Sequence, residues 1–459
     1  QIVRGRMQTA GPIRVARLAE EMALAPSKVD AALVAIEAEG LVMRGHYSPP
    51  SATPHVEGSE DALEWCDRRL LARIHRLTLD GLRRQIAPVA PADYLRFLAD
   101  YQRVSPGRRW HGPAGVREAI RHLQGFEMAA GAWERRVLPA RVKDYDPAWL
   151  DQLAMSGELV WGRLRPFRPD EPERPSSSRL TRAAPLSLML RSDLAWLLPV
   201  DRQSAPPLRS GAEQVLEALT ARGALFYHDL QTATGLLPSH LDEALLELAQ
   251  LGLVTADGIA PVRALSSRLR SSGRDAVRRR ARAAGPTVGL LSTAGRWSLF
   301  PGIVSTMNTQ ERTRQWAVQL LDRWGVLFRD LLAREVAAPP WWQLVSVLRR
   351  MEAQGEVRGG RFVAGVAGEQ YARNESVEHL RSLRDAAPSE DWLVVAGSDP
   401  LNLQGIVTTG ARVAAKATNS LALRNGRVVA TLESGDVHFF DELPLEVSAD
   451  LTRRLRRTG

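Results

Sequence analysis

A chain of 459 residues is too long for one hydrophobic core, and 44% hydrophobic with 25% charged residues is typical of a globular protein with several domains. No apolar run is long enough for a membrane span, and no signal-peptide pattern follows Gln1. The single Cys66 excludes a disulfide framework and a cysteine-rich zinc site, so we expect a reducing, cytoplasmic setting.

The charge balance favours a polyanionic partner. The net charge is +9 and the isoelectric point is near 10.3. Only three of the 61 basic residues are lysines, a bias that a GC-rich bacterial genome produces without any functional cause. Arginine nevertheless binds phosphate through its planar fork of donors, so the composition leaves a nucleic-acid partner open.

The predicted fold class is α+β, with tandem winged-helix modules followed by a small C-terminal β-barrel. Five segments are expected, namely 1–60, 61–200, 201–290, 291–388 and 389–459. The first segment is predicted to hold a helix over 13–22, a helix over 28–39 with Pro26 as its start signal, and a wing strand over 41–47. Residues 49–60 are expected to be a linker. Because a module is complete so early, we expect a piece of a longer protein.

The second segment is predicted to be mostly helical before it ends in a strand over 159–164. The expected helices span 63–82, 93–102, 116–123, 130–138 and 147–155. Residues 166–182 are rich in proline, serine and charge, which predicts a flexible loop.

The third and fourth segments repeat one plan of helix, short strand, helix and wing. The predicted elements are helices over 213–222, 238–250, 311–324 and 340–354, short strands over 224–226 and 326–328, and a fourth wing over 356–364. Between the two modules, residues 266–286 are strongly basic. They are either a solvated loop or an arm that lies on phosphates.

Four glycine steps mark where a predicted helix gives way to a wing: Gly40, Gly157, Gly252 and Gly355. A helix, a glycine stop and a basic hairpin form the second half of a winged helix, which grips nucleic acid more often than it performs chemistry. The third wing carries Thr255, Ala256 and Asp257 in place of arginine, so we expect two copies to contact DNA and the others to pack against the barrel or another protomer.

The last segment is predicted to be a β-domain closed by a basic helix over 445–457. The expected strands span 392–396, 407–409, 420–423 and 428–432. Asn425-Gly426 predicts a tight hairpin turn between the last two strands.

Motifs for the common catalytic chemistries are missing from the sequence. No lysine follows a glycine, which excludes a phosphate-binding loop, and neither Gly-x-Gly-x-x-Gly nor Gly-x-Ser-x-Gly occurs. The nine histidines are scattered, so we expect no metal. No cofactor is expected in this chain.

Aromatic residues beside arginine offer an alternative to catalysis. Trp341 and Trp342 open the fourth recognition-type helix, where either one packs in the core and the other at an interface, or one stacks on a nucleobase. Arg296 and Trp297 are open to a similar pair of interpretations, base stacking or anchoring a strand. The residues predicted to contact nucleic acid are Lys28, Arg44, Arg278, Arg279, Arg280, Arg296, Trp297, Trp341, Trp342, Arg349, Arg358 and Arg361.

Strings along nearly the whole chain resemble the C-terminal region of the large helicase-related (Lhr) family of bacterial superfamily-2 DNA helicases. The longest is GVLFRDLLARE over 325–335. The others lie at 64–74, 125–127, 133–134, 138–142, 145–147, 295–299, 359–365, 368–370 and 399–403.

The resemblance implies a DNA repair helicase whose ATP- and magnesium-dependent core lies outside this chain. The region itself is then expected to bind single-stranded or tailed DNA and to self-associate, with a homotetramer as the expected state. The arrangement is also similar to that of AlkZ-like winged-helix DNA glycosylases, which carry an Asp-Pro-Leu step that Asp399-Pro400-Leu401 matches. The match stops there, because Asn402-Leu403 follow in place of an aromatic residue and Asp-Arg.

Three functions follow as hypotheses. The first is a DNA-binding and oligomerisation region that holds DNA for the motor. The second is a uracil or damaged-base glycosylase in which Asp399, or alternatively Asp441 or Asp450, activates water. The third is a purely structural assembly domain.

Overall fold

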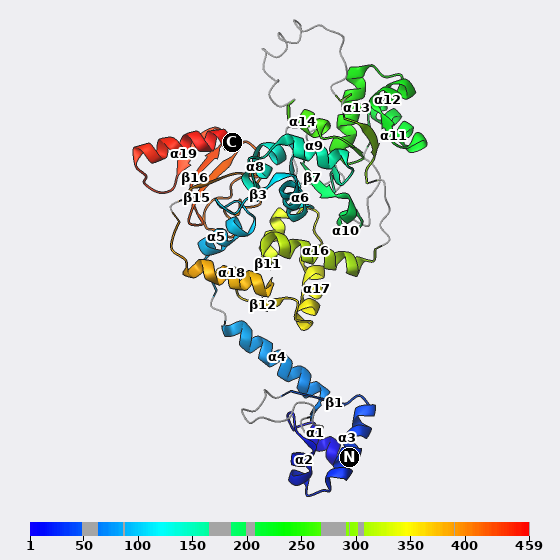
Figure 1. Cartoon of the computed structure of the whole chain (residues 1–459), viewed down its shortest axis with the longest axis vertical. Helices are drawn as coiled ribbons and strands as arrows, with labels where there is room; N and C mark the ends of the chain where they lie inside the picture. The colour runs from blue at the N-terminus through cyan, green and yellow to red at the C-terminus, as the bar shows by residue number, and fades with distance from the viewer. Residues whose placement is uncertain are drawn as a thin grey trace. The chain divides into compact units, whose positions relative to one another are not determined.

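The computed structural model describes residues 1–47, 63–85, 88–164, 185–198, 207–267, 291–292, 294–301, 307–389 and 391–458 (Figure 1). It divides into two compact units, Gln1–Ala87 and Pro88–Gly459. Within the described ranges, no helix combines the length and the apolar character needed to cross a membrane.

The first unit is a winged helix. Its elements are α1 (Ile2–Met7), α2 (Val15–Met22), α3 (Pro26–Ala38), β1 (Val42–Gly45), β2 (Glu64–Asp67) and α4 (Arg68–Gln85). β1 pairs antiparallel with β2, and Ile13 exchanges two backbone hydrogen bonds with Trp65. The predicted helix over 63–82 is therefore wrong at its start: Trp65 is buried against the helices, and this burial fixes an extended segment there.

The second module opens the second unit. Its elements are α5 (Pro91–Tyr101), β3 (Trp110–His111), α6 (Gly112–Leu123), β4 (Met128–Ala129), α7 (Ala130–Ala132), the π-helix η2 (Trp133–Val137), α8 (Leu138–Arg141), β5 (Val142–Lys143), α9 (Pro147–Met155), β6 (Leu159–Gly162), β7 (Pro185–Leu190), η3 (Arg191–Asp193) and α10 (Leu194–Leu197). Strands β4, β7 and β6 form one sheet in that order, and all of β6 is buried. The predicted loop over 166–182 lies outside the described residues.

The third module contains α11 (Ser210–Arg222), β8 (Leu225–Phe226), α12 (Tyr227–Thr234), α13 (Pro238–Leu251), β9 (Val254–Ala256) and α14 (Ala260–Ser267). The order of its sheet is β8-β10-β9, where β10 is Arg296–Leu299. Residues 296–299 were predicted to belong to the fourth segment, but they complete the sheet of the third module.

The fourth module contains α16 (Thr309–Trp324), β11 (Val326–Phe328), η4 (Arg329–Arg334), α17 (Trp341–Ala353), β12 (Arg358–Gly360), β13 (Gln370–Ala372) and α18 (Asn374–Asp385). Its sheet has the order β11-β13-β12, so β12 and β13 form the wing. The repeated glycine stops are confirmed, because Gly40, Gly157, Gly252 and Gly355 all have φ between 73° and 79°.

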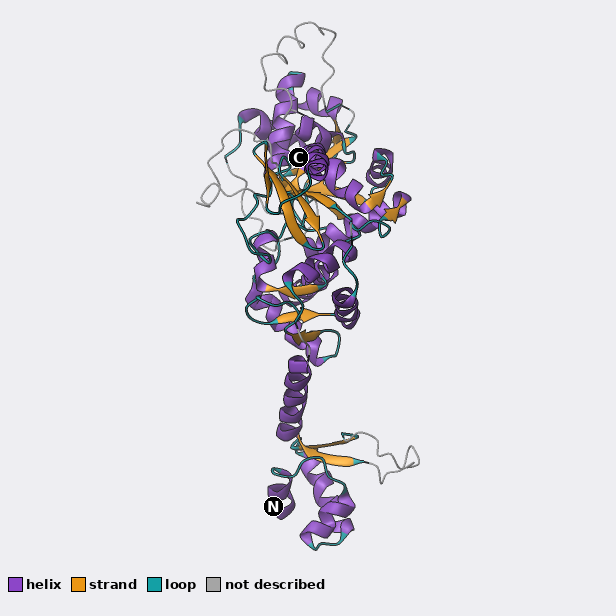
Figure 2. Ribbon diagram, turned by 90° about the vertical axis from the view of Figure 1, so that its left-hand side faces the viewer, coloured by secondary structure: helices purple, strands orange, loops and turns teal. Residues whose placement is uncertain are grey.

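The last part of the chain is an open antiparallel sheet. Its strands, β14 (Leu393–Ala396), β15 (Ser420–Arg424), β16 (Arg427–Glu433) and β17 (Asp436–Phe439), are adjacent in chain order, and α19 (Leu445–Thr458) packs on them (Figure 2). No closed barrel is found among the described residues, so the predicted barrel is not confirmed. The predicted strand over 407–409 is wrong, because a turn with an isolated bridge occupies it. The Asn425-Gly426 hairpin is confirmed.

Candidate nucleic-acid interface

Helix α17 exposes one face to solvent. Its opposite face packs Leu344, Leu348 and Met351 into the core of the module. Trp342 lies on the exposed face with 70% of its surface accessible, whereas Trp341 is half-buried. Adjacent helical residues point about 100° apart, which accounts for the different surroundings of the two tryptophans. Neither tryptophan is buried in the core, so the choice between the two predicted alternatives stays open.

The wing that follows α17 is fixed by buried polar contacts. The backbone N–H of Gly359 donates to the buried carboxylate of Glu352 on α17 at 3.0 Å. The side-chain carbonyl of Gln370 accepts from the N–H groups of Phe362 (2.9 Å) and Val363 (2.8 Å). The wing is therefore held in a defined position beside the exposed face of the helix.

Arginines surround this exposed face. Arg349 pairs with Glu369 at 2.8 Å, but both side chains are exposed, so the pair stabilises the fold only weakly and a phosphate competes with it easily. Arg350, Arg358 and Arg361 are also exposed and have no acidic partner within the described part of the chain. We call Trp342, Arg349, Arg350, Arg358 and Arg361 the fourth-wing face.

The first module exposes two of the predicted cations. Lys28 lies at the start of α3, and Arg44 lies on β1. The guanidinium of Arg44 is 3.4 Å from the carboxylate of Glu37 and 6.0 Å from the ring centre of Trp65. This face is basic, but it has fewer cations without an acidic partner than the fourth-wing face has.

The second wing is buried inside the protein. Trp161 on β6 donates from its indole N–H to the carbonyl of Gly258 (3.0 Å), and Thr255 donates its hydroxyl to the carbonyl of Trp161 (2.7 Å). Arg163 is only 6% exposed and donates to the carbonyl of Gln250. The wings of the second and third modules therefore pack against each other, and the Gly162-Arg163 wing is not available to DNA.

The third module has more acidic side chains than arginines. Glu243 is exposed on α13, and Glu247 on the same helix pairs with Arg209. The guanidinium of Arg296 is 3.0 Å from the carboxylate of Asp257. This surface lacks the surplus of positive charge that phosphate contacts need.

Four of the predicted contacts, Trp297 and Arg278, Arg279 and Arg280, need separate comment. Trp297 is fully buried and packs edge-on against Trp161 with ring centres 6.2 Å apart, so base stacking by Trp297 is a wrong prediction and its role is to anchor β10. Arg278, Arg279 and Arg280 lie outside the described residues. So does most of the basic segment 266–286.

Asp399 lies in a buried ion pair. It is 1% exposed, and its two carboxylate oxygens accept from the guanidinium of Arg141 at 2.7 and 3.0 Å. Arg141 is fully buried and also donates to Gln102, while Arg334 donates to the backbone carbonyl of Asp399. Water activation by Asp399 stays a prediction, but the geometry is that of a bidentate structural pair.

The other acids considered for catalysis are nearer the surface. Asp441 is exposed, and Asp450 pairs with Arg453 and Arg454 on α19. Among the described residues, no group of three or more His, Cys, Asp or Glu side chains is placed to hold a metal.

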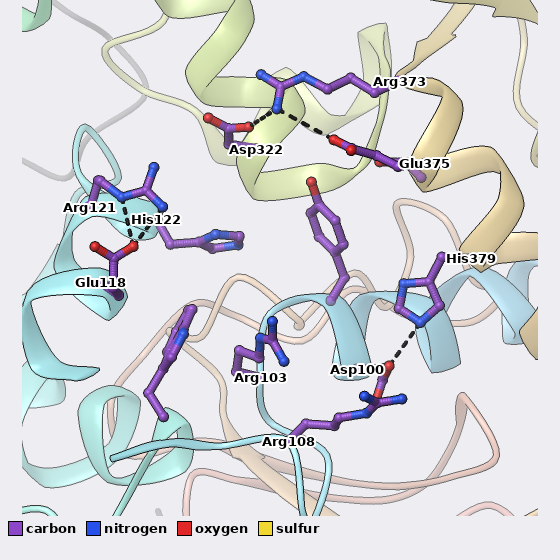
Figure 3. Close-up of a pocket in the computed structure, with 13 residues that line it drawn as sticks. Asp100, Arg103, Arg108, Glu118, Arg121, His122, Asp322, Arg373, Glu375 and His379 are labelled. Atoms are coloured by element: carbon purple, nitrogen blue, oxygen red, sulfur yellow. Dashed lines mark hydrogen bonds and ion pairs between the residues drawn. The ribbon is translucent and has the colours of Figure 1, made fainter. Parts of the chain in front are cut away.

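A cavity of about 720 Å³ lies between α5, α6, α16 and α18 (Figure 3). His122 lies in its wall and is half-buried, and its Nε2 atom is buried. Burial, together with the nearby guanidinium groups of Arg141, Arg323, Arg121 and Arg103, lowers the pKa of His122 to about 3.

This low pKa predicts that the folded protein loses stability at pH values well above those at which carboxylates bind protons. Below the ordinary histidine pKa of about 6.5, His122 binds a proton in the unfolded chain but stays neutral in the folded chain. As the pH is lowered from 6.5 to 5, the free energy of unfolding should therefore fall by up to about 1.4 kcal/mol per pH unit. Urea unfolding at several pH values measures it. His122→Gln should reduce the dependence of the free energy of unfolding on pH. His438→Gln, at an exposed histidine, should leave that dependence unchanged. Equal slopes in all three proteins would contradict the assignment.

Comparisons with known proteins identify the modules. The description "Large helicase-related protein, winged-helix domain" matches residues 89–173 and 306–392. Among relatives, "Lhr helicase/ probable uracil glycosylase" of Mycolicibacterium smegmatis is 31% identical over 452 residues, which cover 93% of this chain and 28% of the relative. The chain belongs to the large helicase-related family. "Lhr helicase/uracil glycosylase" of Escherichia coli is 28% identical over 424 residues, covering 85% of this chain and 26% of the relative.

The chain thus spans about a quarter of the length of these large helicase-related proteins and corresponds to their C-terminal region. The fourth-wing face lies within one matched large helicase-related domain, 306–392. The buried wing of β6 lies within the other, 89–173.

Proposed function

We propose that this chain is the nucleic-acid-binding region of a large helicase-related protein and that the fourth-wing face makes its main contact with DNA. The observation that carries the proposal is the contrast between modules. The fourth wing exposes arginines without acidic partners beside an exposed tryptophan, while the second wing is buried and the third module presents acids. The first module is a secondary contact through Lys28 and Arg44.

The chemistry of this face suits a single strand or the tail of a duplex. Guanidinium groups contact successive phosphates and carry no sequence preference. Trp342 offers a free ring on which an unpaired base stacks, which contributes about 1–3 kcal/mol per base. In this role the chain holds DNA for an ATP-driven motor elsewhere in the full protein. The homotetramer expected from the resemblance stays a prediction that light scattering tests.

Salt dependence of DNA binding tests this function. Replacing Arg350, Arg358 and Arg361 together by alanine should weaken binding to tailed DNA in fluorescence anisotropy. Each lost phosphate contact should also lower the slope of log affinity against log salt by about 0.7–0.9, so the triple variant should lose about 2–3 units of slope.

A matched triple variant separates this face from net charge. Arg209, Arg222 and Arg296, all in or beside the third module, can be replaced by alanine with the same loss of charge. This control should keep most of the affinity and slope. Equal losses in both variants would show that charge alone matters, and undetectable DNA binding by the parent chain would favour the purely structural assembly domain.

A second candidate function is base excision, because both relatives carry uracil glycosylase in their names. Incubating the chain with uracil-containing DNA, followed by alkali, reveals any abasic sites as strand breaks. If Asp399 activates the attacking water, Asp399→Asn should abolish cleavage in a protein that is still folded. Cleavage that survives this change in folded protein would assign catalysis to another residue.

A further inference from the structure

The cavity between α5, α6, α16 and α18 has an aromatic wall. His122 meets the ring of Tyr101 edge-on at 5.8 Å and the ring of Trp110 at 5.9 Å between centres. Trp110 packs so closely on α6 that a Cβ at Gly115 would lie 2.7 Å from the Cβ of Trp110. The wall is therefore a fixed group of rings next to a space that is large enough for a small aromatic ligand.

Of the four arginines that line the cavity, three have acidic partners. Arg108 pairs with Asp100 at 3.1 Å, and the guanidinium groups of Arg121 and Arg373 pair with Glu118 and Asp322. These pairs are drawn in Figure 3. Arg103 has no acidic partner within the described ranges, and its guanidinium lies 5.8 Å from the centre of the Trp110 ring.

The backbone at Arg103 is strained. Its φ is 62°, in the left-handed region, at the position just after α5 where glycine is usual. The N–H of the next residue, Val104, donates to the carbonyl of Ala99, which completes the helix-ending turn. A long cationic side chain is thus kept where glycine would be more stable, and such strain is commonly found at functional sites.

A polar atom also lacks a partner in the same wall. Nε2 of His122 is buried and has no hydrogen-bond partner among the described residues. Because Nε2 is covered, a ligand in the cavity would contact the accessible part of the imidazole ring and not this atom.

We propose that this cavity binds one nucleotide unit, with its base against the rings of Trp110, Tyr101 and His122 and its phosphate on Arg103. The chemical class is a nucleoside monophosphate. Its source is either a free nucleotide or an unpaired nucleotide of a DNA strand. Only the second source rests on the proposed DNA-binding function.

Isothermal titration of the whole chain with thymidine 5′-monophosphate tests the site. The mononucleotide should bind, and inorganic phosphate alone should bind at least tenfold more weakly because it lacks the base. Arg103→Gly should lower the affinity at least tenfold while the melting temperature stays the same or rises, since glycine relieves the strain. Arg329→Ala, at an exposed arginine off the cavity, should bind as the parent chain does.

The outcomes separate the cavity from the fourth-wing face. The absence of mononucleotide binding, or binding unchanged in a folded Arg103→Gly protein, would overturn the proposal. If single-stranded DNA displaces the mononucleotide, the source is a strand; if it does not, the source is a free nucleotide. The Arg350, Arg358 and Arg361 triple variant should keep mononucleotide binding, so failure of the DNA-binding proposal would be seen independently.

Discussion

Asp399→Asn should lower the free energy of unfolding by about 3–5 kcal/mol, because it leaves the buried guanidinium of Arg141 without its counter-charge. Both side chains are at most 1% exposed, so water cannot replace the missing carboxylate. The carboxylate also accepts from the backbone N–H of Leu401, so its loss should loosen the turn after β14. Urea unfolding followed by circular dichroism measures the change.

Two further variants make this test specific. Asp441→Asn removes an exposed carboxylate from the same part of the chain and should change stability by less than about 0.5 kcal/mol. Replacing both partners, Arg141→Met with Asp399→Leu, should recover much of the loss because no buried charge remains. A cost below about 1 kcal/mol for Asp399→Asn would show that the pair does not stabilise the fold and would strengthen the case for catalysis.

Gly426→Ala should destabilise the protein by about 3 kcal/mol or more, since it combines backbone strain with a steric clash. Gly426 has φ of 73°, and a Cβ built on it would overlap the backbone carbonyl oxygen of Ala92 on α5. Backbone atoms cannot rotate away as side chains do. The turn between β15 and β16 would therefore have to move away from α5, with a loss that thermal unfolding detects.

A second hairpin turn supplies the control. Gly435 has φ of 100°, but nothing lies within 4 Å of the Cβ that alanine would add there. Gly435→Ala should therefore cost only the strain, about 1–2 kcal/mol. The difference between the two variants measures the close contact between the C-terminal sheet and α5. Equal losses of stability in the two variants would mean that the turn at Gly426 moves away from α5 at no measurable cost.

Local chemistry made much of the fold predictable. Glycine at a helix end and Asn-Gly between two predicted strands need positive φ, and the structure has positive φ at Gly355 and at Asn425-Gly426. Apolar helical spacing likewise located α9 and α17 to within a residue or two of their observed ends. In these elements the determinants are a few residues apart, so one sequence is enough.

Contacts between distant segments were not predictable in the same way. Trp65 is in a strand because Ile13 pairs with it, and Asp399 is buried because Arg141, 258 residues earlier, lies opposite. Nothing near Trp297 distinguishes a stacking ring from a core ring. Its surroundings depend on Trp161, which packs against it.

In the candidate site, too, features set by neighbouring residues were predictable and features set by distant contacts were not. Loss of charge in the third wing could be read directly from Thr255, Ala256 and Asp257. Burial of the second wing could not, because Gly162-Arg163 looks as basic as the fourth wing in sequence. The cavity was missed altogether, since its arginines and rings come from four separate helices and the loops beside them. The only sequence signal was the cluster of Arg103, Arg108 and Trp110, which is not specific.

Hydrogen–deuterium exchange with and without saturating tailed DNA tests the central claim, that the fourth wing holds nucleic acid while the second and third do not. Slower exchange on DNA binding is predicted for peptides covering α17 and the wing loop, residues 341–369. Peptides covering β6 and α13–β9, residues 159–164 and 238–256, should be unchanged. Protection confined to the second or third module, with none over 341–369, would contradict the claim.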